Sequence, residues 1–106
     1  MTTIPITVEW GARMAENNTR YKVRFSGDVQ GVGFRMTAVS EARGLAANGF
    51  VKNEPDGSVT LDVDGPESDL KELVHQIESE LSDHISDTEI EQLESLNRQG
   101  GVSIKH

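Results

Sequence analysis

The sequence predicts an α+β domain in which two helices pack on one face of an antiparallel sheet of four to five strands. Alternating apolar and polar residues indicate strands buried on one side, and apolar residues spaced three and four apart indicate helices. These patterns follow one another as strand, helix, strand, strand, helix, strand, which is the split β-α-β plan. A chain of 106 residues can form one such domain around one core.

The first strand and the first helix flank a glycine-rich loop. In "YKVRFSG", Tyr21, Val23 and Phe25 alternate with polar residues, so we expect this strand to turn one face to the core. A helix is predicted in "RMTAVSEARGLAA", with Arg35 at or just before its N-terminus. The apolar residues at helical spacing are Val39, Ala42 and Ala46.

The stretch "GFVKNEPDGSVTLDVDG" is typical of a β-hairpin. Its turn, "EPDG", contains the proline and glycine that favour turns. On the return strand, Val59, Leu61 and Val63 alternate with polar residues, which predicts one buried face. On the first strand of this hairpin, Phe50 is expected to occupy a core position.

The second helix has the clearest apolar stripe. Its members lie three or four positions apart and are Leu70, Leu73, Val74, Ile77 and Leu81. Pro66 suits the first helical position, and Glu67 and Asp69 complement the positive end of the helix dipole. His75 falls off the stripe and is expected to face solvent.

The two ends of the chain have weaker patterns. "DTEIEQLES" predicts a further strand, and "GGVSIKH" predicts a short closing strand with Val102 and Ile104 on one face. Residues 1–20 are expected to form an extension outside a domain of residues 21–106. Three alternatives stay open for this extension: an additional edge strand, a contact between copies through Trp10, or disorder.

Composition excludes several classes of protein. There is no cysteine, which excludes disulfides and thiolate metal sites, and no apolar run approaches the roughly 18 residues that span a bilayer. The N-terminus lacks the features of a secretory signal, so a cytoplasmic location is expected. The formal net charge of −8 opposes binding to nucleic acid or to anionic membranes. The acids concentrate between Asp62 and Glu94, so a small anion can still approach the glycine-rich loop.

The stretch "GDVQGVGFR" combines the parts of a phosphate site. Glycine allows successive backbone N–H groups to turn toward one point, and a following helix N-terminus adds more of them. An arginine guanidinium can bind two phosphate oxygens at once. The candidate phosphate-binding residues are Gln30, Gly31, Val32, Gly33, Phe34 and Arg35. The alternative is a tight turn followed by a surface arginine.

Asn53 is the second candidate residue, near the end of a predicted strand in "VKNEPDG". A neutral amide can both donate a hydrogen bond to a water molecule and accept one from it, but it is too weak a base to remove a proton. Asn53 is therefore a candidate for orienting a water molecule. The alternative is an asparagine that serves only the following turn.

The two stretches "GDVQGVGFR" and "GFVKNEPDGSV" together resemble the acylphosphatase family, whose signatures are G-x-V-Q-G-V-x-F-R and G-W-V-x-N-x-x-D-G-x-V. The separation of Arg35 from Asn53 also matches that family. The resemblance implies a ferredoxin-like fold and hydrolysis of acyl phosphates to a carboxylate and inorganic phosphate. It also implies that Gln30–Phe34 and Arg35 bind the phosphate while Asn53 positions the attacking water.

This chemistry implies an enzyme that needs no metal and no cofactor. The carboxylate leaves without being protonated, and phosphoryl transfer requires mainly that the reactants are positioned and that the charge of the transition state is stabilised. The three histidines, His75, His84 and His106, are expected to have no catalytic role. The expected partners are a small-molecule acyl phosphate and the phosphate product, with no nucleic acid and no membrane. The alternative is a non-enzymatic phosphate-binding or anion-binding module on the same fold.

Overall fold

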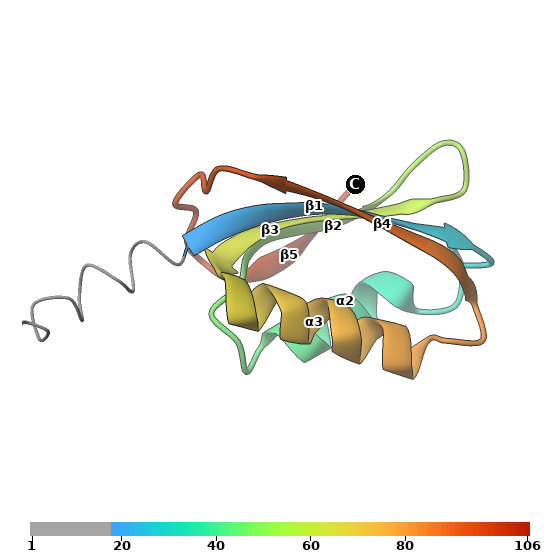
Figure 1. Cartoon of the computed structure of the whole chain (residues 1–106). Coiled ribbons are helices and arrows are strands. Elements are labelled where there is room, and N and C mark those ends of the chain that lie inside the picture. The colour runs from blue at the N-terminus through green and yellow to red at the C-terminus, as the bar shows by residue number, and fades with distance from the viewer. Residues whose placement is uncertain (1–17) are drawn as a thin grey trace, which may run out of the picture.

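The computed structural model describes residues 18–106 as a five-stranded sheet with two helices on one of its faces (Figure 1). The elements, in chain order, are β1 (Asn18–Gly27), α2 (Phe34–Ala42), β2 (Asn48–Asn53), β3 (Val59–Pro66), α3 (Glu67–Glu80), β4 (Ile85–Leu93) and β5 (Val102–Lys105). The predicted order and the predicted fold class are confirmed. Of the proposed extension, residues 1–17 lie outside the described residues, and β1 begins three residues before the predicted strand.

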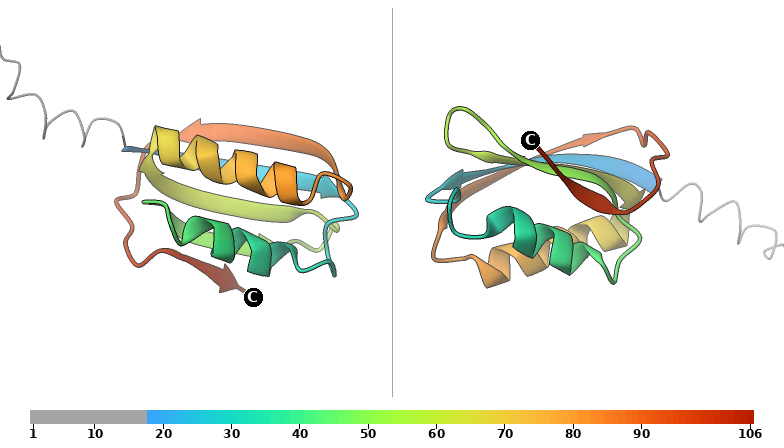
Figure 2. Two further views of the ribbon diagram at one scale, coloured as in Figure 1. Left: turned by 90° about the horizontal axis from the view of Figure 1, so that it is seen from below. Right: turned by 180° about the vertical axis from the view of Figure 1, so that it is seen from behind.

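The strands lie in the order β4-β1-β3-β2-β5. Three neighbouring pairs are antiparallel, but β5 runs parallel to β2, so the sheet is mixed rather than antiparallel throughout. After β4 the chain crosses from one edge of the sheet to the other before it enters β5 (Figure 2). No helix among residues 18–106 is long and apolar enough to cross a membrane.

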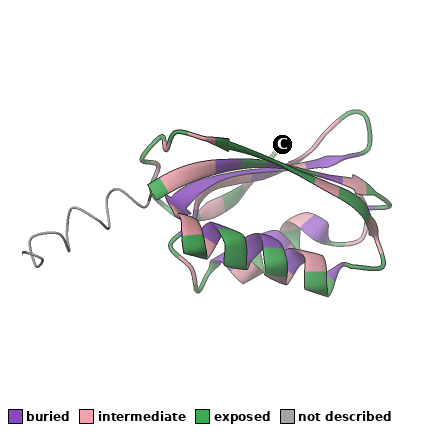
Figure 3. Cartoon of the chain, viewed as in Figure 1, coloured by how far each residue is buried: buried purple, intermediate pink, exposed green. Residues whose placement is uncertain are grey.

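The core lies between the helices and the sheet face that they cover, here called the inner face (Figure 3). The predicted alternation on β1 is confirmed, because Val23 and Phe25 are fully buried and Tyr21 is nearly so. β3 presents Val59, Leu61 and Val63 to the same core. The apolar stripe of α3 is buried as predicted, and His75 is exposed.

The helix α2 is shorter than the sequence pattern predicts, and its buried face also includes Phe34 and Ala38. It ends at Ala42, where hydrogen bonds between residues three apart tighten the chain into a turn. Phe34, Ala38 and Ala42 are buried, whereas Ala46 is exposed. Of the predicted stripe, Ala42 is buried and Val39 packs against the core, but Ala46 was wrong, because helical periodicity was extended through a turn.

The opposite face of the sheet, here called the outer face, carries buried acids. Asp62 and Asp64 alternate with the core residues of β3, yet they are only 3% and 1% exposed. Arg98 donates to Asp64 Oδ1 at 2.6 Å and to Asp62 Oδ1 at 2.7 Å. Arg20 donates to both carboxylate oxygens of Asp62 at 2.9 and 2.8 Å. These ion pairs attach the segment before β5 to the middle of the sheet.

Phe50 also lies on the outer face, because it pairs with Asp62 in the register of β2 and β3. It is half-buried, and Lys105 Nζ lies 4.6 Å from its ring centroid. The expectation of a core position was therefore wrong. Its aromatic ring instead covers outer-face surface beneath cationic side chains.

The two arginines change the ionisation of the acids. Burial by itself would raise the pKa of Asp62, but hydrogen bonds from Arg20 and Arg98 outweigh this effect and lower it. The pKa of Asp64 is also lowered, since Arg98 and Ser95 donate hydrogen bonds that outweigh its burial. Both acids are therefore held as carboxylates, and each depends on its partners.

We expect Arg98→Met to lower the free energy of unfolding by about 2–3 kcal/mol, because it leaves Asp64 buried without its guanidinium partner. Chemical denaturation at neutral pH measures this loss. The matched control is Arg24→Met, which breaks an ion pair with Asp56 in which both side chains are about half exposed, and it should cost about 1 kcal/mol or less. Equal losses in the two variants would contradict the assigned importance of the buried pairs.

Candidate active site

The loop between β1 and α2 presents backbone N–H groups at the start of the helix. Gly31 and Gly33 adopt φ angles of 82° and 79°, in the left-handed region that favours glycine. Gly33 is also the N-cap of α2, and it provides no side-chain cap. The first intrahelical bond from the loop runs from the Thr37 N–H to the Gly33 carbonyl at 3.0 Å. The amides from Phe34 to Met36 precede that bond and have no acceptor within the helix.

Arg35 lies in this first turn of α2 and is half-buried. Within residues 18–106, it forms no ion pair. Its side chain lines a cavity of about 190 Å³. The described residues that line it are Val29, Gly31, Gly33, Phe34, Arg35, Met36, Asn53, Ile104 and His106. A guanidinium without a carboxylate partner, beside free helix amides, suits an anionic ligand.

Asn53 reaches the same cavity from the sheet. It is the last residue of β2 and stands two positions after Val51, so both side chains lie on the inner face. Its Oδ1 atom is buried and has no hydrogen-bond partner among residues 18–106. Buried side-chain oxygens are nearly always paired, so an unpaired acceptor in a cavity indicates a ligand or water that completes it. The structure thus brings together Arg35 and Asn53, as predicted.

Gln30 and Val32 do not line the cavity with their side chains. The Gln30 Nε2 donates to the carbonyls of Glu54 and Ser58 at 2.8 and 2.9 Å. Gln30 therefore ties the loop to the hairpin that follows Asn53. Val32 is partly buried against the core. The side chains of these two candidates position the loop, a role that sequence spacing could not distinguish from anion binding.

Phe34 lines the cavity and is also part of the core. It is 2% exposed, and its ring centroid lies 4.9 Å from that of Phe25 at an angle of 55°. This tilted aromatic contact anchors the first residue of α2 against β1. The helix N-terminus is therefore held by a buried side chain directly before Arg35.

Sequence reasoning missed four lining residues. Val29, in the loop after β1, is a fully buried core residue. Met36, which is 67% exposed, follows Arg35 in the first turn of α2. Ile104 and His106 come from the end of the chain. The alternation of "VSIKH" places Ile104 and His106 on one face, but no local pattern indicates that this strand lies beside Asn53.

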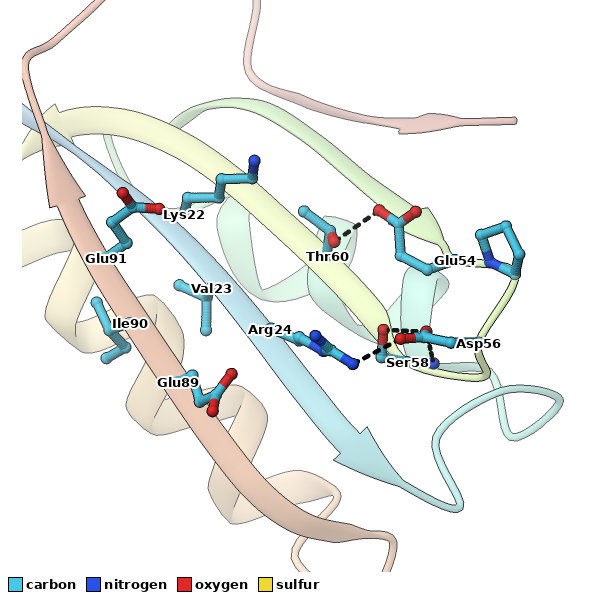
Figure 4. A pocket seen from close by; sticks show the side chains of 11 residues that line it. Lys22, Val23, Arg24, Glu54, Asp56, Ser58, Thr60, Glu89, Ile90 and Glu91 are labelled. Atoms are coloured by element: carbon cyan, nitrogen blue, oxygen red, sulfur yellow. Dashed lines mark hydrogen bonds and ion pairs between the residues drawn. The ribbon is translucent and has the colours of Figure 1, made fainter.

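A larger cavity lies elsewhere, on the outer face between β4 and the hairpin, and it measures about 550 Å³ (Figure 4). Four acids line it, with Lys22 and Arg24 as the only bases. Arg24 is paired with Asp56, and Thr60 donates to Glu54. An excess of carboxylates opposes a phosphate, so size alone does not identify the site.

The residues around the smaller cavity provide no set of metal ligands. Among residues 18–106, no group of three or more histidines, aspartates or glutamates is arranged to hold a metal ion. The ligands available in the 190 Å³ cavity are backbone N–H groups, one guanidinium, one amide and one imidazole. This set is suited to an anion and a water molecule.

Comparisons with known proteins indicate a single family. A family model described as Acylphosphatase matches residues 21–104. An acylphosphatase of Rhizobium etli is 39% identical over 88 residues, covering 80% of this chain and 94% of that protein. One of Mesorhizobium japonicum is 33% identical over 92 residues, covering 86% and 98%. The crystal structure of acylphosphatase from Bacillus subtilis matches with a TM-score of 0.73 and 30% identity, covering 83% of this chain and 99% of that chain.

Removal of the amide of Gln30 tests how the loop is held. We expect Gln30→Leu to lower the free energy of unfolding by about 2 kcal/mol, since two hydrogen bonds to the hairpin are lost. Urea denaturation measures the change. Gln92→Leu, at an exposed position on the edge strand β4, is the control and should change stability by about 0.5 kcal/mol or less. Unchanged stability in Gln30→Leu would show that these bonds do not hold the loop.

Proposed function

The chain belongs to the acylphosphatase family, and from that premise we propose that it hydrolyses acyl phosphates in the cavity between α2 and the end of β2. The substrate class and the products, a carboxylate and inorganic phosphate, follow from the family. The assignment of the reaction to this cavity is supported by one observation above all. Asn53 Oδ1 is buried without a partner in the cavity that Arg35 also lines.

In the proposed complex, the phosphoryl group lies against the start of α2. The N–H groups that precede the first helical bond point toward the N-terminal end of the helix, where the dipole favours negative charge. The guanidinium of Arg35 binds two phosphoryl oxygens and stabilises the charge that spreads over them in the transition state. A Cβ at Gly31 or Gly33 would meet no heavy atom within 4 Å, so the loop leaves room for a ligand on this side.

Asn53 places the water molecule. Its Oδ1 accepts a hydrogen bond from the water, which directs a lone pair of the water oxygen at phosphorus. A bond forms between the water oxygen and phosphorus while the bond from phosphorus to the acyl oxygen breaks. The acyl oxygen leaves as a carboxylate, and the proton of the water passes to the phosphate product. No strong general base is required, because the transition state is loose and the proton departs late.

The Arg35→Ala variant tests whether Arg35 binds the phosphoryl group. We expect kcat/KM for benzoyl phosphate to fall about 10³-fold, because the transition-state charge loses its guanidinium. Inorganic phosphate should also bind more weakly as a competitive inhibitor. The assay follows ultraviolet absorbance with a metal chelator present, and wild-type activity should be unaffected by the chelator. Arg43→Ala, at the exposed C-terminal end of α2, is the control and should behave as wild type.

The Asn53→Ala variant separates an enzyme from an anion-binding module. We expect kcat to fall about 10²-fold, since the water is no longer positioned, while the inhibition constant of phosphate stays close to wild type. Lys52→Ala is the matched control, because its side chain lies on the outer face of the same strand. Full turnover in Asn53→Ala would remove its proposed role. Phosphate binding by a wild-type protein that lacks turnover would favour the module.

A further inference from the structure

The parallel ladder between β2 and β5 determines what stands next to Asn53. In this ladder Val51 pairs with Ile104. Two residues further along, in the same direction on both segments, come Asn53 and His106. His106 is the first residue after β5, and it lines the 190 Å³ cavity together with Ile104 and Asn53. The register therefore brings an imidazole to the side of Asn53 that faces the edge of the sheet.

His106 also lines the cavity that contains Arg35 and Asn53, and its side chain is exposed. It therefore lies where the cavity opens to solvent. The loop is held on the other side of β2, since Gln30 donates to the carbonyl of Ser58 next to β3. An anion bound at the start of α2 would thus have the loop on one side and His106 on the other.

The negative charge of a bound phosphoryl group would exceed the positive charge that Arg35 provides. A phosphoryl group carries a charge of about −1.5 to −2, whereas Arg35 is the one fixed cation among the described residues that line the cavity. An imidazole changes its charge between about pH 5 and pH 8, and its N–H groups can donate to anionic oxygens. His106 is the remaining lining residue that can carry positive charge.

The other charged side chains of the adjoining strands are directed away from His106. Lys52 and Lys105 are neighbours in the ladder of β2 and β5, and their side chains lie on the outer face. There the amine of Lys105 lies over the ring of Phe50. The carboxylate of Glu54 accepts a hydrogen bond from Thr60, which is also on the outer face. From α2, Arg35 alone reaches the cavity as a charged side chain, and the loop contributes none. A dependence of anion binding on pH near neutrality would thus arise from His106.

We propose that the imidazole of His106 is a second side-chain ligand for the anion, so that its protonation strengthens binding. This inference rests on the proposed function, because it places the anion in the same cavity. In its protonated form the imidazole donates a hydrogen bond to a phosphoryl oxygen at the edge of the cavity nearest β5. At higher pH the positive charge is lost, and binding weakens while the contacts of Arg35 and Asn53 remain.

The test uses sulfate as the probe, since sulfate keeps its charge throughout this pH range. Binding is followed by backbone amide shifts in NMR spectra of the full chain, with any purification tag at the N-terminus. In wild type we expect the dissociation constant to increase about three- to tenfold between about pH 6 and pH 8. His106→Gln should bind weakly at both pH values, and His106→Lys should bind tightly at both.

His75→Gln is the matched control, because His75 is exposed on α3 and does not line the cavity. It should retain the pH dependence of wild type. In wild type itself, the imidazole resonances of His106 should move on addition of sulfate, whereas those of His75 should not. This measurement needs no variant and is independent of how well His106→Gln folds.

The same pH dependence of sulfate binding in wild type and in His106→Gln would overturn the proposal. Imidazole resonances of His106 that do not shift at saturating sulfate would also overturn it. Failure of the proposed function would be distinguishable. In that case sulfate would bind with the predicted pH dependence, but benzoyl phosphate would not be hydrolysed.

Discussion

Unpaired polar groups are the constraint on which this structure depends. The N–H groups at the start of α2 and the Oδ1 of Asn53 must stay free of protein partners if they are to bind a phosphoryl group and a water molecule. A buried polar group without a hydrogen bond costs about 1–3 kcal/mol. The surrounding structure must therefore hold these groups in place, because any relaxation that paired them would be favourable.

Buried contacts on both sides of the cavity provide this restraint. Phe34 fixes the first residue of α2 in the core, and Gln30 fixes the loop to the hairpin. On the outer face, Arg98 binds Asp62 and Asp64 and thereby attaches the segment that leads into β5. Between β4 and β5 the chain must pass from one edge of the sheet to the other, which places Ile104 and His106 beside β2. Structural ion pairs far from the cavity thus help determine its composition.

The distribution of charge is consistent with selection for a small anion. Most of the carboxylates lie between Asp62 and Glu94, on β3, α3 and β4, whereas no carboxylate of the described part of the chain lines the 190 Å³ cavity. The large groove on the outer face is lined by more acids than bases and would repel a phosphate. Chemical character therefore separates the two cavities more clearly than volume does.

The sequence by itself determined the element order, and it indicated the candidate phosphate loop and the roles proposed for Arg35 and Asn53. Alternation and helical spacing are local patterns, and two motifs at one separation are specific. Only the tertiary structure decided that β5 lies parallel to β2, that the side chain of Gln30 holds the hairpin, and that Asp62 and Asp64 are buried. These features arise from contacts between segments distant in the chain. A local pattern shows which face of a strand a residue occupies, but not which strand lies beside it.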